Sequence, residues 1–222
     1  MNWVANNLDL IGQLTFVHAR QSLVALALGF VLSLPIGWAA WRVRWLRGLL
    51  TGVTGLLYTV PSLALLVILP VIAGYPAASE ANLVVALTLY ALAILVRTVV
   101  DALDSVDGDV RQAADALGFG GLRRFFAVDL RLAVPVLLAG LRVTAVSTVA
   151  LATVGILVGV ENLGYLFTNG LQRRIIAEVF AGVLAVVIIA LVIDLALQLL
   201  GRVLTPWLHA TTRRARVEGR AA

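Results

Sequence analysis

The feature that most constrains the fold is a series of apolar runs long enough to cross a lipid bilayer. The first, "QSLVALALGFVLSLPIGWAAW", occupies residues 21–41 and is flanked by Arg20 and Arg42. A bilayer core of about 30 Å requires roughly 20 apolar residues in a helix. Only 13% of the residues are charged, compared with roughly 25% in a typical soluble domain. The sequence therefore predicts an all-α integral membrane protein.

The apolar runs predict five membrane-spanning helices, at about 21–41, 49–73, 81–100, 132–152 and 178–201. The second contains Pro61, which lacks a backbone N–H and should bend that helix. Residues 153–177 are also apolar but are interrupted by four glycines. We interpret them as a re-entrant or interfacial element, with a sixth span as the alternative, because non-helical backbone in a membrane must be satisfied by protein or water.

The arginines predict the orientation, because loops rich in basic residues remain in the cytoplasm. With five spans and the N-terminus outside, the outer face carries only three arginines, Arg20, Arg173 and Arg174. We therefore expect an extracytoplasmic segment at 1–20 and a transmembrane domain at 21–207. The domain would contain a cytoplasmic loop at 101–131, and a basic cytoplasmic tail would follow at 208–222.

The composition argues against several other classes of protein. There is no cysteine, hence no disulfide or thiolate metal site. The two histidines, His18 and His209, are too far apart in the sequence to argue for a metal centre. The arginines flank apolar runs rather than a hydrophilic surface, which disfavours nucleic-acid binding despite the net charge of +5. The chain also lacks a G-x-x-x-x-G-K-[ST] phosphate-binding loop, so we expect neither ATPase nor other enzyme activity.

A short polar helix is predicted in the cytoplasmic loop, within "DVRQAADALGFGG" at 109–121. Asp107 or Asp109 is suited to cap its start, and Gly118 is placed for a left-handed end. The spacing of 3.6 residues per turn predicts one face with Val110, Ala113, Ala114 and Leu117, and an opposite face with Arg111, Gln112 and Asp115. The helix either packs on its own loop or fits a groove on a separate protein.

The stretch "QAADALG" followed by "AVDLRLAVP" resembles the EAA loop of permease subunits of ATP-binding cassette importers. The positions that match the family pattern are Gln112 (in place of Glu), Ala113, Ala114, Gly118, Val128 and Leu130. Arg131 stands where the family usually has proline, and Pro135 is expected to begin the next helix instead.

The resemblance extends over roughly residues 20–207. "YTVPSLALLVILP" at 58–70 and "VGVENLGYLFTNGL" at 158–171 are similar to the osmoprotectant branch, which takes up glycine betaine, choline, carnitine and proline. Methionine-importer permeases share much of this plan, so methionine or another small solute is the alternative substrate. A stand-alone ion-coupled transporter is the rival class, but it requires inverted repeats or a set of intramembrane ionisable residues.

The resemblance implies a type I importer fold and several partners. They are a second permease subunit, identical or closely related, an extracytoplasmic substrate-binding protein, and two ATPase subunits that bind ATP and Mg²⁺. This chain itself would hold no cofactor. The resemblance also implies that the cytoplasmic helix is seated in a cleft of the ATPase. The residues that it assigns to this coupling are Val110, Arg111, Gln112, Ala113, Ala114, Asp115, Leu117 and Gly118.

Candidate pathway and gate residues are Tyr58, Pro61, Tyr90, Glu161, Gly164 and Tyr165. A quaternary ammonium is attracted to aromatic faces and negative charge, which favours the tyrosines and Glu161. The alternative for the tyrosines is a role at membrane interfaces or in helix contacts. A bend at Pro61 would widen a cavity or would be ordinary curvature, and the glycine-rich segment around Gly164 is a candidate outer gate.

Arg142 and Asp194 are the two charges placed well inside predicted spans. Isolated charges in a membrane are costly and are usually paired. We expect both to face the interior of the bundle, where each is a candidate partner for the other. The alternative is that each lies near the inner surface and extends its polar end toward water.

Overall fold

The computed structural model describes residues 2–207, and in that range the chain forms helices and loops without strands. The elements are α1 (Asn2–Asn6), α2 (Leu8–Arg42), α3 (Arg44–Thr59), α4 (Ser62–Ala73), α5 (Glu80–Asp104), α6 (Gly108–Ala116), α7 (Gly121–Arg124), the π-helical η1 (Phe125–Asp129), α8 (Leu130–Ala152), the 3₁₀-helical η2 (Thr153–Val158), α9 (Gly164–Gln172) and α10 (Ile176–Leu204). The predicted basic tail at 208–222, with His209, lies outside the described residues.

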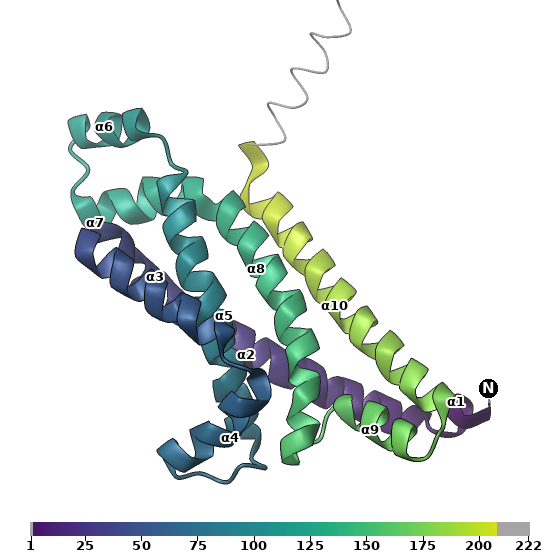
Figure 1. The fold of residues 1–222 in the computed structure, drawn as a ribbon. Coiled ribbons are helices and arrows are strands. Elements are labelled where there is room, and N and C mark those ends of the chain that lie inside the picture. Colours follow the sequence, from purple (N-terminus) through teal and green to yellow (C-terminus); the bar gives the residue numbers. More distant parts are fainter. Residues whose placement is uncertain (1, 208–222) are drawn as a thin grey trace, which may run out of the picture.

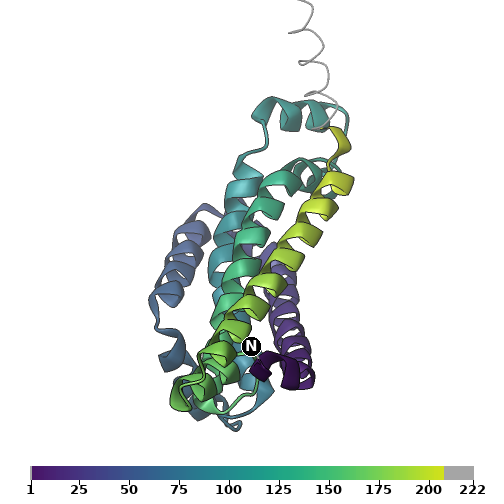
Figure 2. The ribbon, with the colours of Figure 1, turned by 90° about the vertical axis from the view of Figure 1, so that its right-hand side faces the viewer.

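The helices form an elongated bundle with two distinct ends (Figures 1 and 2). α6 and the C-terminal end of α10 lie at one end, whereas α1 and α9 lie at the other (Figure 1). Within the described residues, four helical stretches are long and apolar enough to cross a membrane, and α3 with α4 makes a fifth if this bent pair is one span. The five predicted spans therefore correspond in order to α2, α3 with α4, α5, α8 and α10.

The first span is longer than predicted, because α2 begins at Leu8 rather than at residue 21. Polar residues of 8–20 have partners on other helices, one of them buried and one exposed. His18 is fully buried, with its Nε2 2.9 Å from the carbonyl oxygen of Val149. Arg20 donates two hydrogen bonds to the carboxylate of Glu80, at 2.8 and 2.6 Å. The expected boundary at residue 20 therefore falls inside a continuous helix.

The single helix predicted for 49–73 is wrong, because the chain bends by 109° between α3 and α4. Pro61 caps the start of α4 rather than lying inside one helix. Proline has no N–H with which to continue the ladder of α3, and the carbonyl of Val60 is left outside both helices. The buried Tyr90 hydroxyl of α5 donates to that carbonyl, which stabilises the break.

Residues 153–177 do not form a sixth span. The segment contains η2, a turn and α9, and α9 has only nine residues, which is about 13 Å at 1.5 Å per residue. This length is less than half of a bilayer core of about 30 Å. The interfacial interpretation therefore describes α9 better than a crossing does.

Pro135 does not begin a helix, contrary to the prediction. It lies inside α8, which starts at Leu130 and directly follows η1. The backbone N–H of Leu130 donates to the carbonyl of Phe125, five residues earlier, so the wider π turn carries the chain into α8 without a break. Arg131 is exposed at the first turn of α8, a position that needs no proline.

α5 is the central helix of the bundle, and most of its residues are buried. It packs closely on α2 through small residues, as is common between membrane helices. A Cβ atom added at Gly29 would lie 2.5 Å from Cβ of Ala91, and one at Gly37 would lie 2.5 Å from Cβ of Val99. The distance between these two helices therefore depends on the absence of side chains at both positions.

We expect Gly37→Ala to destabilise the bundle by about 1–3 kcal/mol, because the added methyl group forces α2 away from α5. Thermal unfolding of the purified protein in detergent measures the change. Gly52→Ala in α3 is the matched control, since nothing lies within 4 Å of its added Cβ. A melting temperature of the Gly37 variant equal to that of the control would contradict the close packing of α2 on α5.

Candidate coupling site and pathway residues

α6 is a short helix with a defined cap at each end. At its start, the side chain of Asp107 accepts a hydrogen bond of 2.8 Å from the backbone N–H of Asp109. At its end, Gly118 adopts a left-handed conformation with φ of 80°. The N–H groups of Gly118 and Phe119 donate to the carbonyls of Asp115 and Ala114, at 3.0 and 3.1 Å. These bonds form a Schellman motif, which fixes the end of a helix that is too short to be stable alone.

Four charged side chains hold α6 against the bundle, and we call them the Asp129 cluster: Arg111, Asp115, Arg124 and Asp129. Asp129 at the end of η1 is 1% exposed and lies 2.8 Å from Nε of Arg111 and 3.4 Å from Nε of Arg124. Nη1 of Arg124 donates to both carboxylate oxygens of Asp115, at 2.7 and 2.5 Å. Two arginines thus neutralise two carboxylates, which offsets the cost of burying Asp129.

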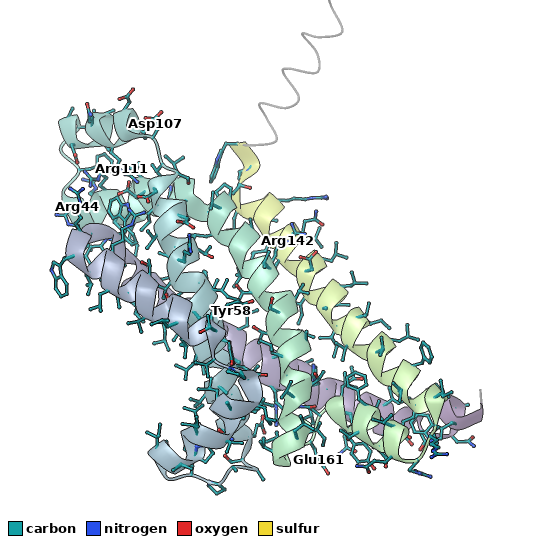
Figure 3. The ribbon with its side chains drawn as sticks, viewed as in Figure 1. Arg44, Tyr58, Asp107, Arg111, Arg142 and Glu161 are labelled. Carbon is teal, nitrogen blue, oxygen red and sulfur yellow. The ribbon has the colours of Figure 1, made fainter. Side chains whose placement is uncertain are left out.

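The same arginine joins α6 to the membrane-spanning helices. Arg111 extends from α6 toward the bundle (Figure 3) and donates to the carbonyl of Leu103 in the last turn of α5. Its guanidinium also lies 4.9 Å from the ring centroid of Trp41 in α2, a distance suited to a cation–π contact. At the same end of the bundle, Asp104 of α5 accepts hydrogen bonds from Trp41 and from Arg47 of α3. A displacement of α6 is therefore transmitted to several spans.

The face of α6 that remains free agrees with the predicted one at Val110, Ala113 and Leu117 and differs from it at Ala114. Ala114, expected on the docking face, is buried against the chain itself, while Arg111 and Asp115 point into the Asp129 cluster. The exposed residues include Val110 (40%), Gln112, Ala113, Ala116 and Leu117 (78%), and the side chain of Asp115 is also 50% exposed. Arg111 reaches from α6 to Asp129, so its side of the helix packs toward the bundle. One side of α6 therefore packs on its own loop, as one of the two interpretations predicts, and docking of the other side to a separate protein stays a prediction.

The structure does not gather the predicted tyrosines into one site. Tyr58 is exposed on α3, about midway along the bundle, whereas Glu161 lies at the end opposite α6 (Figure 3). Tyr90 is buried and serves the break at Val60, as described above. Tyr165 of α9 packs against the core cluster that includes α10. These three side chains therefore form no aromatic cage within one chain.

Gly164 is required by close packing in the turn between η2 and α9. A Cβ atom there would lie 2.1 Å from the carbonyl oxygen of Thr153. The fully buried Asn162 holds this turn: its Nδ2 donates to the carbonyl of Ala152 at 2.7 Å, and its Oδ1 accepts from the N–H of Gly164 at 2.8 Å. The sequence reasoning missed Asn162, although a lone amide in the apolar "GVENLG" was a signal for such a role.

A second missed residue is Glu178, in the first turn of α10. It is fully buried, and its Oε1 accepts a hydrogen bond of 2.6 Å from Nδ2 of Asn169 in α9. Asn162 and Glu178 together fasten the short helix α9 to the ends of α8 and α10. Among the described residues there is no group of three or more potential metal-ligating side chains.

Arg142 of α8, labelled in Figure 3, is paired with Asp194 of α10. Nε and Nη2 of Arg142 lie 2.7 and 2.8 Å from the two carboxylate oxygens of Asp194, which is a bidentate pair. The pair does not face a closed interior, because the side chains of Arg142 and Asp194 are 36% and 29% exposed. They open onto a hollow of about 520 Å³ lined by Ala139, Arg142, Val143, Val146, Ser147 and Asp194.

A bundle of apolar helices long enough to span a membrane, with a capped helix fixed at one end, is compatible with the membrane subunit of a transporter. Comparison with known families agrees. The sequence profile of the family described as "Binding-protein-dependent transport system inner membrane component" matches residues 25–210. The chain therefore belongs to this family, and it is a multi-pass protein of the inner membrane.

Individual relatives identify the branch of the family to which the chain is similar. The osmoprotectant import permease protein OsmW of Salmonella typhimurium is 30% identical over 214 residues, covering 93% of this chain and 97% of the relative. The carnitine transport permease protein OpuCB of Listeria monocytogenes is 31% identical over 192 residues, covering 86% and 87% of the two chains. These matches confirm the resemblance to ABC importer permeases of the osmoprotectant branch. Membership in this class implies an ATPase and a substrate-binding protein as partners.

A solved structure supports the fold independently. The bundle superposes on a chain of the inward-facing MetNI methionine ABC transporter with a TM-score of 0.79, covering 89% of this chain and 97% of that one. The sequence identity is 23%, so this likeness establishes the type I importer fold alone. The predicted fold class is thus confirmed.

We expect Asp129→Asn to loosen α6 without unfolding the spans. The change leaves two arginines beside a neutral amide, and breaking such a buried pair costs about 3 kcal/mol. Hydrogen–deuterium exchange of the backbone amides in 108–118 should become faster by at least tenfold, while exchange in α5 and α8 stays unchanged. Asp101→Asn is the control, because its pair with Arg97 is long, at 3.9 Å, and exposed. Equal exchange in α6 of both variants would show that the Asp129 cluster does not hold the helix.

Proposed function

We propose that this chain forms the translocation pathway of an ATP-driven importer for osmoprotectants such as glycine betaine, choline, carnitine or proline. The observation that carries the proposal is the nearly full-length similarity to permeases named for osmoprotectant and carnitine transport. The capped helix α6, fixed by the Asp129 cluster, supplies the coupling element that such an importer needs.

The free face of α6 is the docking surface for the ATPase. Ala113 has a short side chain and Gln112 a polar one, which allows the ATPase to approach the backbone of α6 closely. Leu117, at 78% exposure, is an apolar side chain that can insert into a cleft of the ATPase. The ATPase binds ATP and Mg²⁺, and its closure displaces α6. The Asp129 cluster and the contact of Arg111 with α5 convert this displacement into movement of the spans.

The end of the bundle that carries α6 is the cytoplasmic end, with the N-terminus outside. Within residues 2–207, that end carries eight arginines, namely Arg42, Arg44, Arg47, Arg111, Arg123, Arg124, Arg131 and Arg202, whereas the α9 end carries Arg20, Arg173 and Arg174. This asymmetry agrees with the positive-inside rule. The substrate-binding protein then docks at the α9 end, where the turn held by Asn162 is placed to act as an outer gate.

Two such subunits, identical or closely related, enclose the pathway. One chain leaves the Arg142–Asp194 pair open to a hollow on its surface. Charges exposed to hydrocarbon in the middle of a span are costly. A second subunit across this face would shield the pair from lipid.

The proposed function is tested by reconstitution in liposomes with the cognate ATPase and substrate-binding protein. We expect saturable uptake of labelled glycine betaine, carnitine, choline or proline that stops when ATP is omitted. Methionine is the comparison solute, and ion gradients without ATP provide the comparison energy source. Uptake of methionine alone would overturn the substrate class, and uptake driven by a gradient without ATP would overturn the importer.

We expect Ala113→Trp to uncouple the ATPase, because the bulky ring separates α6 from the cleft. The ATPase activity stimulated by the substrate-binding protein, and the uptake, should both fall by at least tenfold, a loss typical of a disrupted interface position. Insertion and thermal stability should be unchanged. Arg202→Trp, on an exposed position of α10 at the same end, is the matched control. Normal stimulation in the Ala113 variant would exclude the free face of α6 as the docking surface.

A further inference from the structure

The Arg142–Asp194 pair lies deep in the membrane. Arg142 is about 18 Å along α8 from Leu130, and Asp194 is about 15 Å before the end of α10 at Leu204, at 1.5 Å per residue. The hydrocarbon core is about 30 Å thick, so the pair lies near its middle. Neither side chain turns to an aqueous end of the bundle, since each bonds the other.

The exposure of this pair is the feature that calls for an explanation. About a third of each side chain is exposed, at 36% and 29%, whereas a purely structural ion pair in a membrane is expected to be enclosed. Hydrocarbon cannot cover it at an acceptable energetic cost, so the hollow beside it must hold water, another polar molecule or protein. Its volume of about 520 Å³ lies within the roughly 300–1,000 Å³ usual for small-molecule sites.

The pair retains unused hydrogen-bonding capacity. Nε and Nη2 of Arg142 are occupied by Asp194, but guanidinium has five N–H donors in all, and each carboxylate oxygen accepts more than one bond. A molecule in the hollow can therefore bind to both groups without first separating them. The remaining lining, from Ala139, Val143, Val146 and Ser147, is small and mostly apolar, which suits methyl or methylene groups.

We propose that Arg142 and Asp194 form a subsite in the translocation pathway that binds zwitterionic solutes. The guanidinium binds the carboxylate of the solute, and Asp194 faces its ammonium group. A zwitterion placed antiparallel to the pair matches both charges and leaves the membrane site neutral. The subsite rests on the proposed function only in its assignment to an import pathway; its ligand chemistry follows from the pair and the hollow.

This subsite is suited to brief, weak binding of the solute rather than to binding with high affinity. No aromatic side chain lines the hollow among the described residues, so the cation–π contribution of an aromatic cage is missing. The solute also competes with an existing ion pair. Transport requires sites that a solute both enters and leaves, so weak binding here is compatible with passage.

The first test uses the absence of natural cysteines. Ser147→Cys places one thiol in the hollow, and the complex with the ATPase is reconstituted in liposomes. The trimethylammonium thiosulfonate reagent MTSET, which does not cross membranes, is present on both sides, and the mass of this chain reports the reaction. We expect labelling that glycine betaine slows by at least fivefold, while sucrose at equal osmolarity does not.

Val192→Cys in α10 is the matched control, because Val192 is 60% exposed but does not line the hollow. Its labelling should not respond to glycine betaine. No reaction of the Ser147 variant would show that the hollow is dry, and reaction without protection by any zwitterion would show that it binds none. Either result overturns the subsite. Protection by methionine but not by glycine betaine would support the zwitterion subsite and contradict the proposed osmoprotectant substrates.

The second test separates a binding site from a structural ion pair. The double variant Arg142→Gln with Asp194→Asn removes both charges together, which avoids an unpaired charge in the membrane. Glycine betaine loses both attractions, so its uptake efficiency should fall on the order of tenfold, as expected when charge-assisted bonds are lost. Choline has no carboxylate, and the lost attraction to Asp194 is offset by the lost repulsion from Arg142.

Arg20→Gln with Glu80→Gln is the control, because this pair also joins two helices and is similarly exposed, at 50% and 45%. It should affect the two solutes equally. An equal fall for glycine betaine and choline in the Arg142–Asp194 double variant would identify that pair as a structural link and overturn the subsite. Absence of uptake of both solutes by the unaltered complex would instead refute the proposed function, and the labelling of Ser147→Cys would still decide on the subsite.

Discussion

The buried carboxylate of Asp129 is the interaction on which the arrangement of the cytoplasmic end depends. A carboxylate that is 1% exposed beside a membrane requires compensation, and two arginines from different helices provide it. Arg111 comes from α6 and Arg124 from α7, so satisfying one charge fixes three elements relative to one another. The second carboxylate of the cluster, Asp115, balances the second arginine. The whole cluster is neutral, which lets Asp129 remain buried beside the half-exposed Asp115 while the cluster determines the position of α6.

This arrangement divides the surface of α6 between two roles. Long charged side chains point inward and join the helix to α5, α7 and η1, whereas small or apolar side chains such as Ala113 and Leu117 are left outside. A helix such as α6 transmits a displacement to the spans only if it is rigid and is bonded to the helices beside it. The caps at Asp107 and Gly118 supply stiffness, and the Asp129 cluster supplies the attachment. The sequence "DVRQAADALG" thus supplies the free face and two members of the cluster, Arg111 and Asp115, whereas the cap residue Asp107 and the partners Arg124 and Asp129 lie outside it.

Local patterns in the sequence predicted the elements but not their long-range partners. Hydropathy located all five spans, and the cap residues located α6, because both signals lie within a few residues. The start of α2 was misplaced because Arg20 was taken as the end of the apolar run, although it is paired with Glu80, far along the chain. Pro61 predicted a bend, but its angle depends on Tyr90 of another helix. The free face of α6 depends on Asp129, which no helical wheel of α6 contains.

Asp129 and Arg142, which α8 connects, differ in how far they are buried, and this difference reflects a structural role for Asp129 and a solute-binding role proposed for Arg142. Asp129 immediately precedes α8 and is almost completely buried, whereas Arg142 lies within α8 and shares its pair with a hollow. A group that only holds structure is stable when every bond is made and water is excluded, whereas a group that meets a solute must keep bonding capacity free. Both lie on one helical stretch, about 20 Å apart at 1.5 Å per residue. A rotation of α8 imposed through the Asp129 cluster would therefore also reorient Arg142, so that the proposed ATPase contact and the proposed solute subsite would act on the same helix from different positions.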